Sequence, residues 1–228
     1  GRMKEPEEIF DRTAAIFSEN KKLKGKKILI TAGGTREKID PVRYITNASS
    51  GKMGLALADN AYRMGADVTL ISTFKADKPY KNIVTETALE MEKAVKENLS
   101  NQDCVIMAAA VSDYRVENCA ENKIKKQGNK LTLELVENPD ILKSICKTPN
   151  KIICGFCAES ENLLENAKAK IQKKGCDFLI ANDISRKDIG FNTDENEVYI
   201  IDKSLNIKHI EKDTKENIAR RILEEIFE

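Results

Sequence analysis

The chain has 228 residues, of which 41% are hydrophobic and 33% are charged, and this ordinary globular composition argues against an intrinsically disordered protein. The 38 basic and 37 acidic residues leave a net charge of +1, so bulk charge does not indicate a nucleic-acid partner. No apolar run approaches the roughly 20 residues needed to span a bilayer. We therefore expect neither a nucleic-acid nor a membrane partner. The six cysteines are scattered through a chain that is not short and loop-rich, so we interpret them as reduced thiols and expect a cytoplasmic protein.

The first half of the chain alternates strands and helices. Residues 1–24 are polar and helix-prone, which predicts a linker or docking helix outside the core. Buried strands are predicted from their apolar runs, and helices from apolar residues spaced three and four apart. These elements are strands at 27–31, 67–72 and 104–111, and helices at 52–64, ended by Gly65, and at 88–99.

The same alternation continues downstream, with strands at 151–156 and 177–181 and helices at 139–146, 161–174 and from Thr214 to the C-terminus. Asn138 is the predicted cap of the first of these helices, and Gly175 ends the second. Strands this apolar, separated by helices, predict a parallel sheet covered on both faces. The fold class is therefore α/β and Rossmann-like, with ligands at the carboxyl ends of the strands.

Three segments depart from this rhythm. Residues 130–136 alternate apolar and polar side chains, and residues 197–202 and 206–210 have the pattern of a hairpin. We expect them to form a small antiparallel extension. Because exposed strand edges invite pairing with another chain, this extension predicts a homodimer.

The connection from 31 to 54 is the most unusual part of the sequence, since a plain strand-to-helix turn needs only a few residues. Gly33 and Gly34 allow close approach of the backbone to a ligand. Ser49, Ser50 and Gly51 precede the helix, where free N–H groups and the helix dipole favour an anion. The alternative, in which Ser50 is only a helix cap and the glycines only a turn, does not explain the length of the loop.

Two common nucleotide motifs do not match this connection. A Walker loop needs Ser or Thr after Gly51-Lys52, and the chain has Met53. The dinucleotide fingerprint fails because Gly33 and Gly34 are adjacent. Cys154 and Cys157 form a C-x-x-C pair, which we interpret as two buried thiols on a strand, not as a metal or redox site.

Further candidate residues follow the strand at 104–111. Small side chains at Ala109 and Ala110 leave room for a ligand, and Asp113 could hold a metal ion or a ribose hydroxyl. The basic run at 123–126, with Gly128 beside it, is either a solvated face or a mobile flap that closes on phosphates.

The chain resembles phosphopantothenate–cysteine ligase of the bacterial CTP-using type, the ligase half of the bifunctional decarboxylase–ligase of coenzyme A biosynthesis. Six motifs carry the resemblance, and the first is long and specific. They are I-T-A-G-G-T-R-E-x-I-D-P-V-R-x-I-T-N-x-S-S-G-K-M-G (30–54), A-A-V-S-D-Y (109–114), K-I-K-K (123–126), N-P-D-I (138–141), G-F-C-A-E-S (155–160) and A-N-D-I-S (181–185).

The resemblance implies a two-step reaction. The carboxylate of 4′-phosphopantothenate attacks the α-phosphate of CTP, and L-cysteine then displaces CMP to form the amide. Mg²⁺ would be the metal cofactor. A homodimer would share its active site across the interface. The resemblance also implies that FMN belongs to an upstream decarboxylase domain, joined by residues 1–24 to a ligase domain at 25–228.

The resemblance assigns roles to particular residues. Asn47 and Lys123 would be catalytic, and Lys123 would also bind the nucleotide from a flap. The other implied nucleotide ligands are Gly33, Gly34, Ser49, Ser50, Gly51, Ala109, Asp113 and Phe156, with Asp113 also the metal ligand. Phosphopantothenate would be bound by Arg43, Asn47, Ala109 and Ala110. Two other classes stay open, a nicotinamide-dependent oxidoreductase and a non-catalytic nucleotide-binding module.

Overall fold

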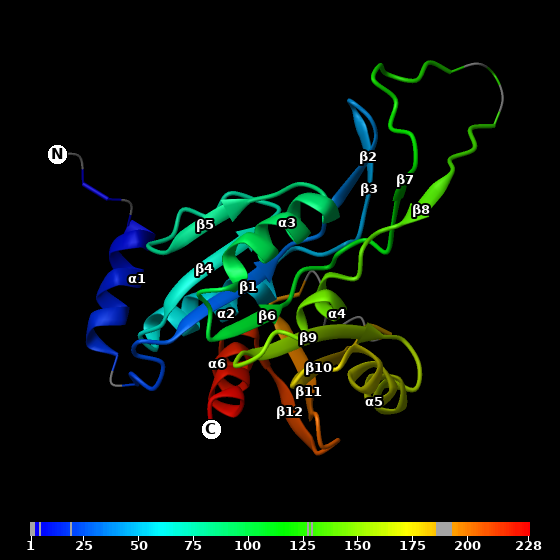
Figure 1. Ribbon diagram of the computed structural model, residues 1–228. Helices are drawn as coiled ribbons and strands as arrows, with labels where there is room; N and C mark the ends of the chain where they lie inside the picture. Colours follow the sequence, from blue (N-terminus) through cyan, green and yellow to red (C-terminus); the bar gives the residue numbers. More distant parts are fainter. Residues whose placement is uncertain (1–2, 5, 19, 127, 129, 186–192) are drawn as a thin grey trace.

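The structure is a computed structural model that describes residues 3–4, 6–18, 20–126, 128, 130–185 and 193–228. At its centre is an eight-stranded sheet of order β12-β11-β10-β9-β6-β1-β4-β5, in which all neighbouring strands pair in parallel except β11, which is antiparallel to both β10 and β12 (Figure 1). The strands are β1 Lys27–Ala32, β4 Asp67–Ser72, β5 Lys81–Val84, β6 Cys104–Met107, β9 Ile152–Glu159, β10 Phe178–Asp183, β11 Glu195–Asp202 and β12 Ile207–Thr214. The predicted α/β class is confirmed.

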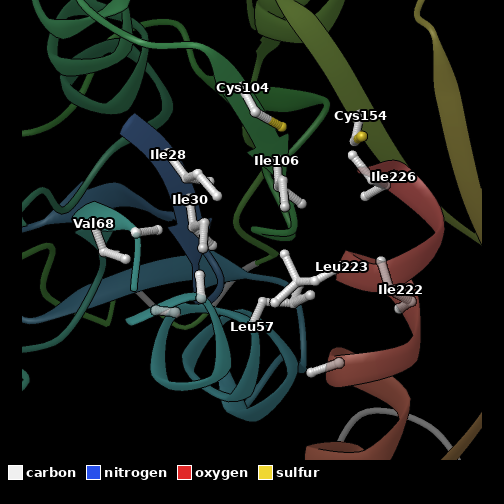
Figure 2. Close-up of a cluster of buried hydrophobic side chains, with 14 of the residues drawn as sticks. Ile28, Ile30, Leu57, Val68, Cys104, Ile106, Cys154, Ile222, Leu223 and Ile226 are labelled. Carbon is white, nitrogen blue, oxygen red and sulfur yellow. The ribbon is translucent and has the colours of Figure 1, made fainter. Parts of the chain in front are cut away.

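Helices cover both faces of the sheet. One face packs against α2 (Lys52–Arg63) and α6 (Lys215–Ile226). The other packs against α3 (Ala88–Leu99), α4 (Ile141–Ile145) and α5 (Leu163–Lys174). This division follows from the alternation of side chains along a strand. Figure 2 shows the first face, where Ile28 and Ile30 of β1 gather with Leu57 of α2 and Leu223 of α6.

Several predicted helix ends are confirmed. Gly175 ends α5 in the left-handed conformation, and the Thr214 side chain caps α6 by accepting from Asn217 N–H. The predicted cap of α4 is wrong. Asp140, not Asn138, accepts from Lys143 N–H, and Asn138 and Pro139 precede the helix. An aspartate three residues before a free N–H is an equally good cap, and local pattern could not separate the two residues.

The antiparallel elements match the prediction in part. The predicted hairpin at 197–202 and 206–210 is confirmed as β11–β12, which extends the main sheet at one edge. Only the end of the 130–136 segment is a strand, β8 (Leu135–Glu137), which pairs with β7 (Tyr114–Val116). The connection predicted as a loop contains a second hairpin, β2 (Arg36–Asp40) and β3 (Arg43–Thr46).

The N-terminal segment contains a helix, α1 (Pro6–Phe17). Of the two predicted alternatives, a linker and a docking helix, the structure has the helix. Its Asp11 is buried and forms ion pairs with Arg63 of α2 and with Lys78. The expectation that residues 1–24 lie wholly outside the core is wrong for Leu23. Its side chain is fully buried in the same hydrophobic cluster as Met64, and its N–H donates to the Met64 carbonyl. Among the described residues, no helix is both long and apolar enough to cross a bilayer.

The cysteines are expected to differ sharply in reactivity. Cys154 and Cys157 are buried on β9, whereas Cys119 is exposed. Burial raises the pKa of Cys157 to about 12, so at pH 8 roughly one thiol in ten thousand is ionised. Iodoacetamide at pH 8 should alkylate Cys119 in the native protein, and Cys154 and Cys157 only after unfolding, as peptide mass spectrometry would show. Rapid native alkylation of Cys157 would contradict the assignment of the C-x-x-C pair as inert.

Candidate functional site

A cavity of about 690 Å³ lies at the carboxyl edge of the parallel strands. Its walls come from the start of α2, the segment after β6, the segment before α4, and β9. Most of the predicted site residues line it: Asn47, Ser49, Ser50, Gly51, Ala109, Ala110, Asp113 and Phe156. Most of the predicted site residues therefore lie at the edge of the sheet where the ligand site was predicted.

The N-terminus of α2 opens into this cavity. Gly51 is the N-cap residue, with a φ of 75°, and as a glycine it has no side chain that could cap the helix. Ser50 is therefore not the cap, and the cap-only alternative is wrong. The Ser49 hydroxyl accepts from Gly51 N–H at 3.3 Å, which orients the turn. Backbone N–H groups of the first helical turn and the positive end of the dipole thus face the cavity, as an anion site requires.

Next to the cavity, the backbone segments that follow β1 and β6 continue the pairing of these two strands. Ala110 N–H donates to the Gly33 carbonyl at 2.8 Å, and Thr35 N–H donates to the Ala110 carbonyl at 3.2 Å. The Asn47 amide reaches across, with Nδ2 at 3.4 Å from the Ala110 carbonyl and 3.3 Å from the Val111 carbonyl. Asn47 therefore ties the loop before α2 to the segment after β6, and it does so at the cavity wall.

The two adjacent glycines serve the packing of this loop. A Cβ on Gly34 would lie 2.7 Å from the Asn47 carbonyl oxygen, so no other residue fits between the segments. Gly34 lines a neighbouring cavity of about 400 Å³, which shares Asn47, Ser49 and Ser50 with the larger one. Gly33 belongs to neither set of lining residues, within the described part of the chain.

Four lysines at the cavity were missed in the sequence: Lys52, Lys170, Lys174 and Lys215. The pair on α5 is spaced four residues apart and so shares one helix face, which is the signal that could have revealed it. Both of these lysines form ion pairs, Lys170 with Glu159 and Lys174 with Asp140. These contacts hold positive charge at one wall of the cavity.

Lys215 is the most enclosed of these cations. It is 6% exposed and donates to the Thr193 carbonyl. Burial, followed by repulsion from Lys52, lowers the pKa of Lys215 below its ordinary value. A lysine at the first position of α6 also opposes the helix dipole, so the position favours a nearby negative charge.

The acidic side of the cavity comes from Asp113 and Asp140. Asp113 is exposed, and its segment is held by Asn138, whose side chain donates to the Ser112 carbonyl at 2.9 Å and whose N–H donates to the Asp113 carbonyl at 2.7 Å. Burial raises the pKa of Asp140, but hydrogen bonds from Lys174 and from Lys143 N–H outweigh it and lower the pKa. Three-residue clusters suited to a metal are absent among the residues that the structure describes.

Arg43 and Lys123 do not line the cavity of their own chain, as far as the described residues go. The Arg43 guanidinium forms an ion pair with Asp40 and donates from Nη2 to the Ile124 carbonyl at 3.0 Å. Lys123 is exposed, in the loop between β7 and β8. The structure thus gathers the Asn47, Ser49–Gly51, Ala109–Asp113 and Phe156 groups, and leaves these two cations apart from them.

Comparison with known proteins identifies the family to which this chain belongs. Residues 23–228 match the family described as the DNA/pantothenate metabolism flavoprotein C-terminal domain. The chain is 42% identical over 233 residues to the coenzyme A biosynthesis bifunctional protein CoaBC of Haemophilus influenzae, and 42% identical over 238 residues to the Escherichia coli K12 protein of that name. The matches cover 100% and 99% of this chain but 58% and 57% of those relatives, so the chain spans less than three fifths of their length.

A solved structure supports the same placement. The crystal structure of the C-terminal domain of a coenzyme A biosynthesis bifunctional protein CoaBC superposes with a TM-score of 0.76 at 36% identity. The match covers 91% of this chain and 96% of that one. The Rossmann-like arrangement of the parallel sheet is therefore shared with that domain.

Proposed function

Because the chain belongs to the DNA/pantothenate metabolism flavoprotein C-terminal domain family, we propose that it is a phosphopantothenate–cysteine ligase domain that uses CTP. One observation carries the proposal beyond family membership. The open N-terminus of α2 and the lysines of α5 meet at one cavity, and that cavity also contains Asn47. A triphosphate and a phosphorylated acid are both polyanions, which such a site can hold together.

The reaction has two displacement steps. A carboxylate oxygen of 4′-phosphopantothenate forms a bond to the α-phosphorus of CTP, and pyrophosphate leaves with the bonding electrons. The amine of L-cysteine then attacks the acyl carbon of the acyl-cytidylate, loses a proton to solvent, and CMP leaves. Neither step uses a nucleophile from the protein, so catalysis rests on positioning and on stabilising charge.

The cavity residues divide between these tasks. Ser49, Ser50 and Gly51 would hold phosphate oxygens at the start of α2, with Lys174 of α5 as a further cation. Phe156 would lie against the base. The Asn47 amide would donate to the acyl oxygen as negative charge develops there. Asp113 fits a Mg²⁺ ion, because this ion needs only one or two carboxylates when phosphates supply the other oxygens, and the metal would neutralise triphosphate charge.

Arg43 and Lys123 enter the proposal through a second copy of the chain. The hairpins β2–β3 and β7–β8 project together from one end of the sheet (Figure 1). They carry exposed apolar side chains, including Val42, Tyr44 and Leu135. Burial of these side chains against a second copy would favour a homodimer. Lys123 would then act on the acyl-cytidylate, and Arg43 would meet the phosphate of phosphopantothenate, both at the partner's cavity instead of their own.

The function is tested by following pyrophosphate release with Mg²⁺, 4′-phosphopantothenate and each of CTP, ATP, GTP and UTP, with and without cysteine. Release that requires phosphopantothenate and is fastest with CTP is the expected result. Tight nucleotide binding with no release under any of these conditions would instead support a non-catalytic binding module. Binding of NADPH would support the oxidoreductase class.

Replacing Lys174 with Gln should weaken binding of CTP by about ten-fold or more, because a hydrogen bond to a charged phosphate contributes about 1.5–3 kcal/mol. Titration calorimetry with CTP measures this directly. Lys173→Gln is the matched control, since it removes the same charge from the exposed neighbour on α5. Equal losses in the two variants would mean that only the net charge of the helix matters, and would remove Lys174 from the site.

A further inference from the structure

A single carboxylate joins the β2–β3 hairpin to the loop that follows β7. The Asp40 side chain has 0% exposure, although it belongs to a hairpin turn. Its Oδ1 accepts from Val42 N–H at 2.9 Å and from Arg43 N–H at 3.0 Å, which shapes the turn. Its Oδ2 accepts from Arg43 Nε at 3.0 Å, and Arg43 Nη2 completes the ion pair.

The same ion pair binds both backbone groups of one residue, Ile124, in the distant loop. Ile124 N–H donates to Asp40 Oδ2 at 3.1 Å, and the Ile124 carbonyl accepts from Arg43 Nη2 at 3.0 Å. Ala120 N–H adds a backbone bond to the Ile39 carbonyl at 3.0 Å. Ile124 is half-buried, while its neighbours Lys123 and Lys125 are exposed. The basic run is therefore anchored at its second residue and not freely mobile.

The electrostatics keep the carboxylate of this anchor ionised near neutral pH. The Arg43 guanidinium, helped by N–H groups of Val42 and Ile124, holds the pKa of Asp40 well below its usual range. Asp40 therefore stays ionised, and so keeps accepting all of these hydrogen bonds, throughout the neutral range. A fully enclosed carboxylate is costly to desolvate unless every bond is made, so its partners are tightly specified.

We propose that Asp40 is a positioning residue that sets the place of Lys123 by clamping, together with Arg43, the backbone N–H and carbonyl of the adjacent Ile124. Its role in catalysis rests on the proposed function, in which Lys123 acts on the acyl-cytidylate; the clamp itself does not. Because Arg43 belongs to the same clamp, the two cations expected to meet substrate are held in one fixed relation. Asp40 touches neither substrate in this scheme and acts only through the loop.

The clamp is tested by limited proteolysis with trypsin, which cuts after Lys123, Lys125 and Lys126. Asp40→Asn keeps the shape of the side chain but loses its charge, and should speed native cleavage at these sites by about ten-fold. Glu86→Gln is the matched control, because it removes the Lys38–Glu86 ion pair on the same hairpin and should cleave at the wild-type rate. Wild-type cleavage of Asp40→Asn would overturn the clamp.

A measurement on the unaltered protein covers the case in which Asp40→Asn does not fold. Hydrogen exchange of the wild-type chain should show the Ile124 amide protected by about ten-fold or more over a free peptide. Exchange of this amide at the free-peptide rate would equally overturn the clamp.

The positioning role is tested by kinetics of the second half-reaction, with pyrophosphate release measured alongside. Asp40→Asn should slow amide formation and spare pyrophosphate release, which is also the expected result for Lys123→Gln, and the double variant should be no slower than Lys123→Gln alone. If Lys123→Gln is impaired but Asp40→Asn is not, the positioning inference is wrong and the proposed function stands. If neither variant is impaired while pyrophosphate release is normal, the proposed role of Lys123 is wrong, and the positioning role with it.

Discussion

Asn47→Asp should block amide formation while pyrophosphate release from CTP and 4′-phosphopantothenate persists. The Asn47 amide lies at the cavity wall, within 3.4 Å of the Ala110 carbonyl, and can donate to an acyl oxygen that gains negative charge. A carboxylate cannot donate and would repel that oxygen. Loss of one such donor typically costs about 10²–10³-fold in rate. Rapid-quench assays that count pyrophosphate and the cysteine amide separately would measure both steps.

Two further results bear on this prediction. Asn98→Asp on α3 makes the same change of charge away from the cavity, and should leave both half-reactions at the wild-type rate. Equal loss of the two half-reactions in Asn47→Asp would contradict its role in the second step. A thermal melt should accompany the assay, because Asn47 also bonds to the Val111 carbonyl.

Mixing Asn47→Asp with Lys123→Gln extends the test to the shared site. If Lys123 acts on the partner's cavity, a mixed dimer has one cavity with both native residues. A one-to-one mixture should then recover about a quarter of the wild-type amide formation. No recovery, with dimer exchange shown by native mass spectrometry, would place Lys123 at the cavity of its own chain.

Gly54→Ala should destabilise the protein, although helix propensity alone predicts a gain of about 1 kcal/mol. Gly54 is in the first turn of α2, where the helix crosses β1. An added Cβ would lie 2.6 Å from the Ala32 Cβ and 2.7 Å from the Thr31 carbonyl oxygen, and neither atom can rotate away. Such overpacking typically costs about 2–3 kcal/mol, or about 4–12 °C in Tm for a chain of this size.

Differential scanning calorimetry would measure this shift, with Gly175→Ala as the control. Nothing lies within 4 Å of a Cβ built on Gly175, so its only cost is the strained φ of 76° at the end of α5. That cost is about 1–2 kcal/mol, less than for Gly54→Ala. A rise in Tm for Gly54→Ala would contradict the prediction, because it would show that α2 can shift away from β1 without a loss of stability.

Much of the fold was predictable because the information is local. The strand Lys27–Ala32 and the helix Lys52–Arg63 were predicted within one residue at each end. Their apolar periodicities differ, and glycines end the helices where only a left-handed residue fits. The site edge was predictable as well, because parallel strands bring their carboxyl ends to the same side.

Shorter elements were not predictable for a physical reason. The hairpin of Arg36–Asp40 and Arg43–Thr46 has few buried apolar side chains and is held by pairing and by Asp40. The apolar run from Cys104 predicted a strand to Val111, but the strand ends at Met107. Just beyond that end, the Ala109 N–H donates to the hydroxyl of Thr31 on β1 instead of to a neighbouring strand. Thr31 is 78 residues away in the sequence, so the pattern of residues around Ala109 could not predict this hydrogen bond.

The sequence by itself determined the chain order of the longer strands and helices, the α/β class and the nucleotide-site candidates around Ser49–Gly51, since short-range periodicity and helix-end chemistry encode them. Only the tertiary structure decided which charges meet. It brought Lys170 and Lys174 to the cavity, left Arg43 and Lys123 outside it, and placed Asp40 against Ile124. Side chains far apart in sequence become neighbours through packing of the whole sheet, and no pattern within one element records that contact.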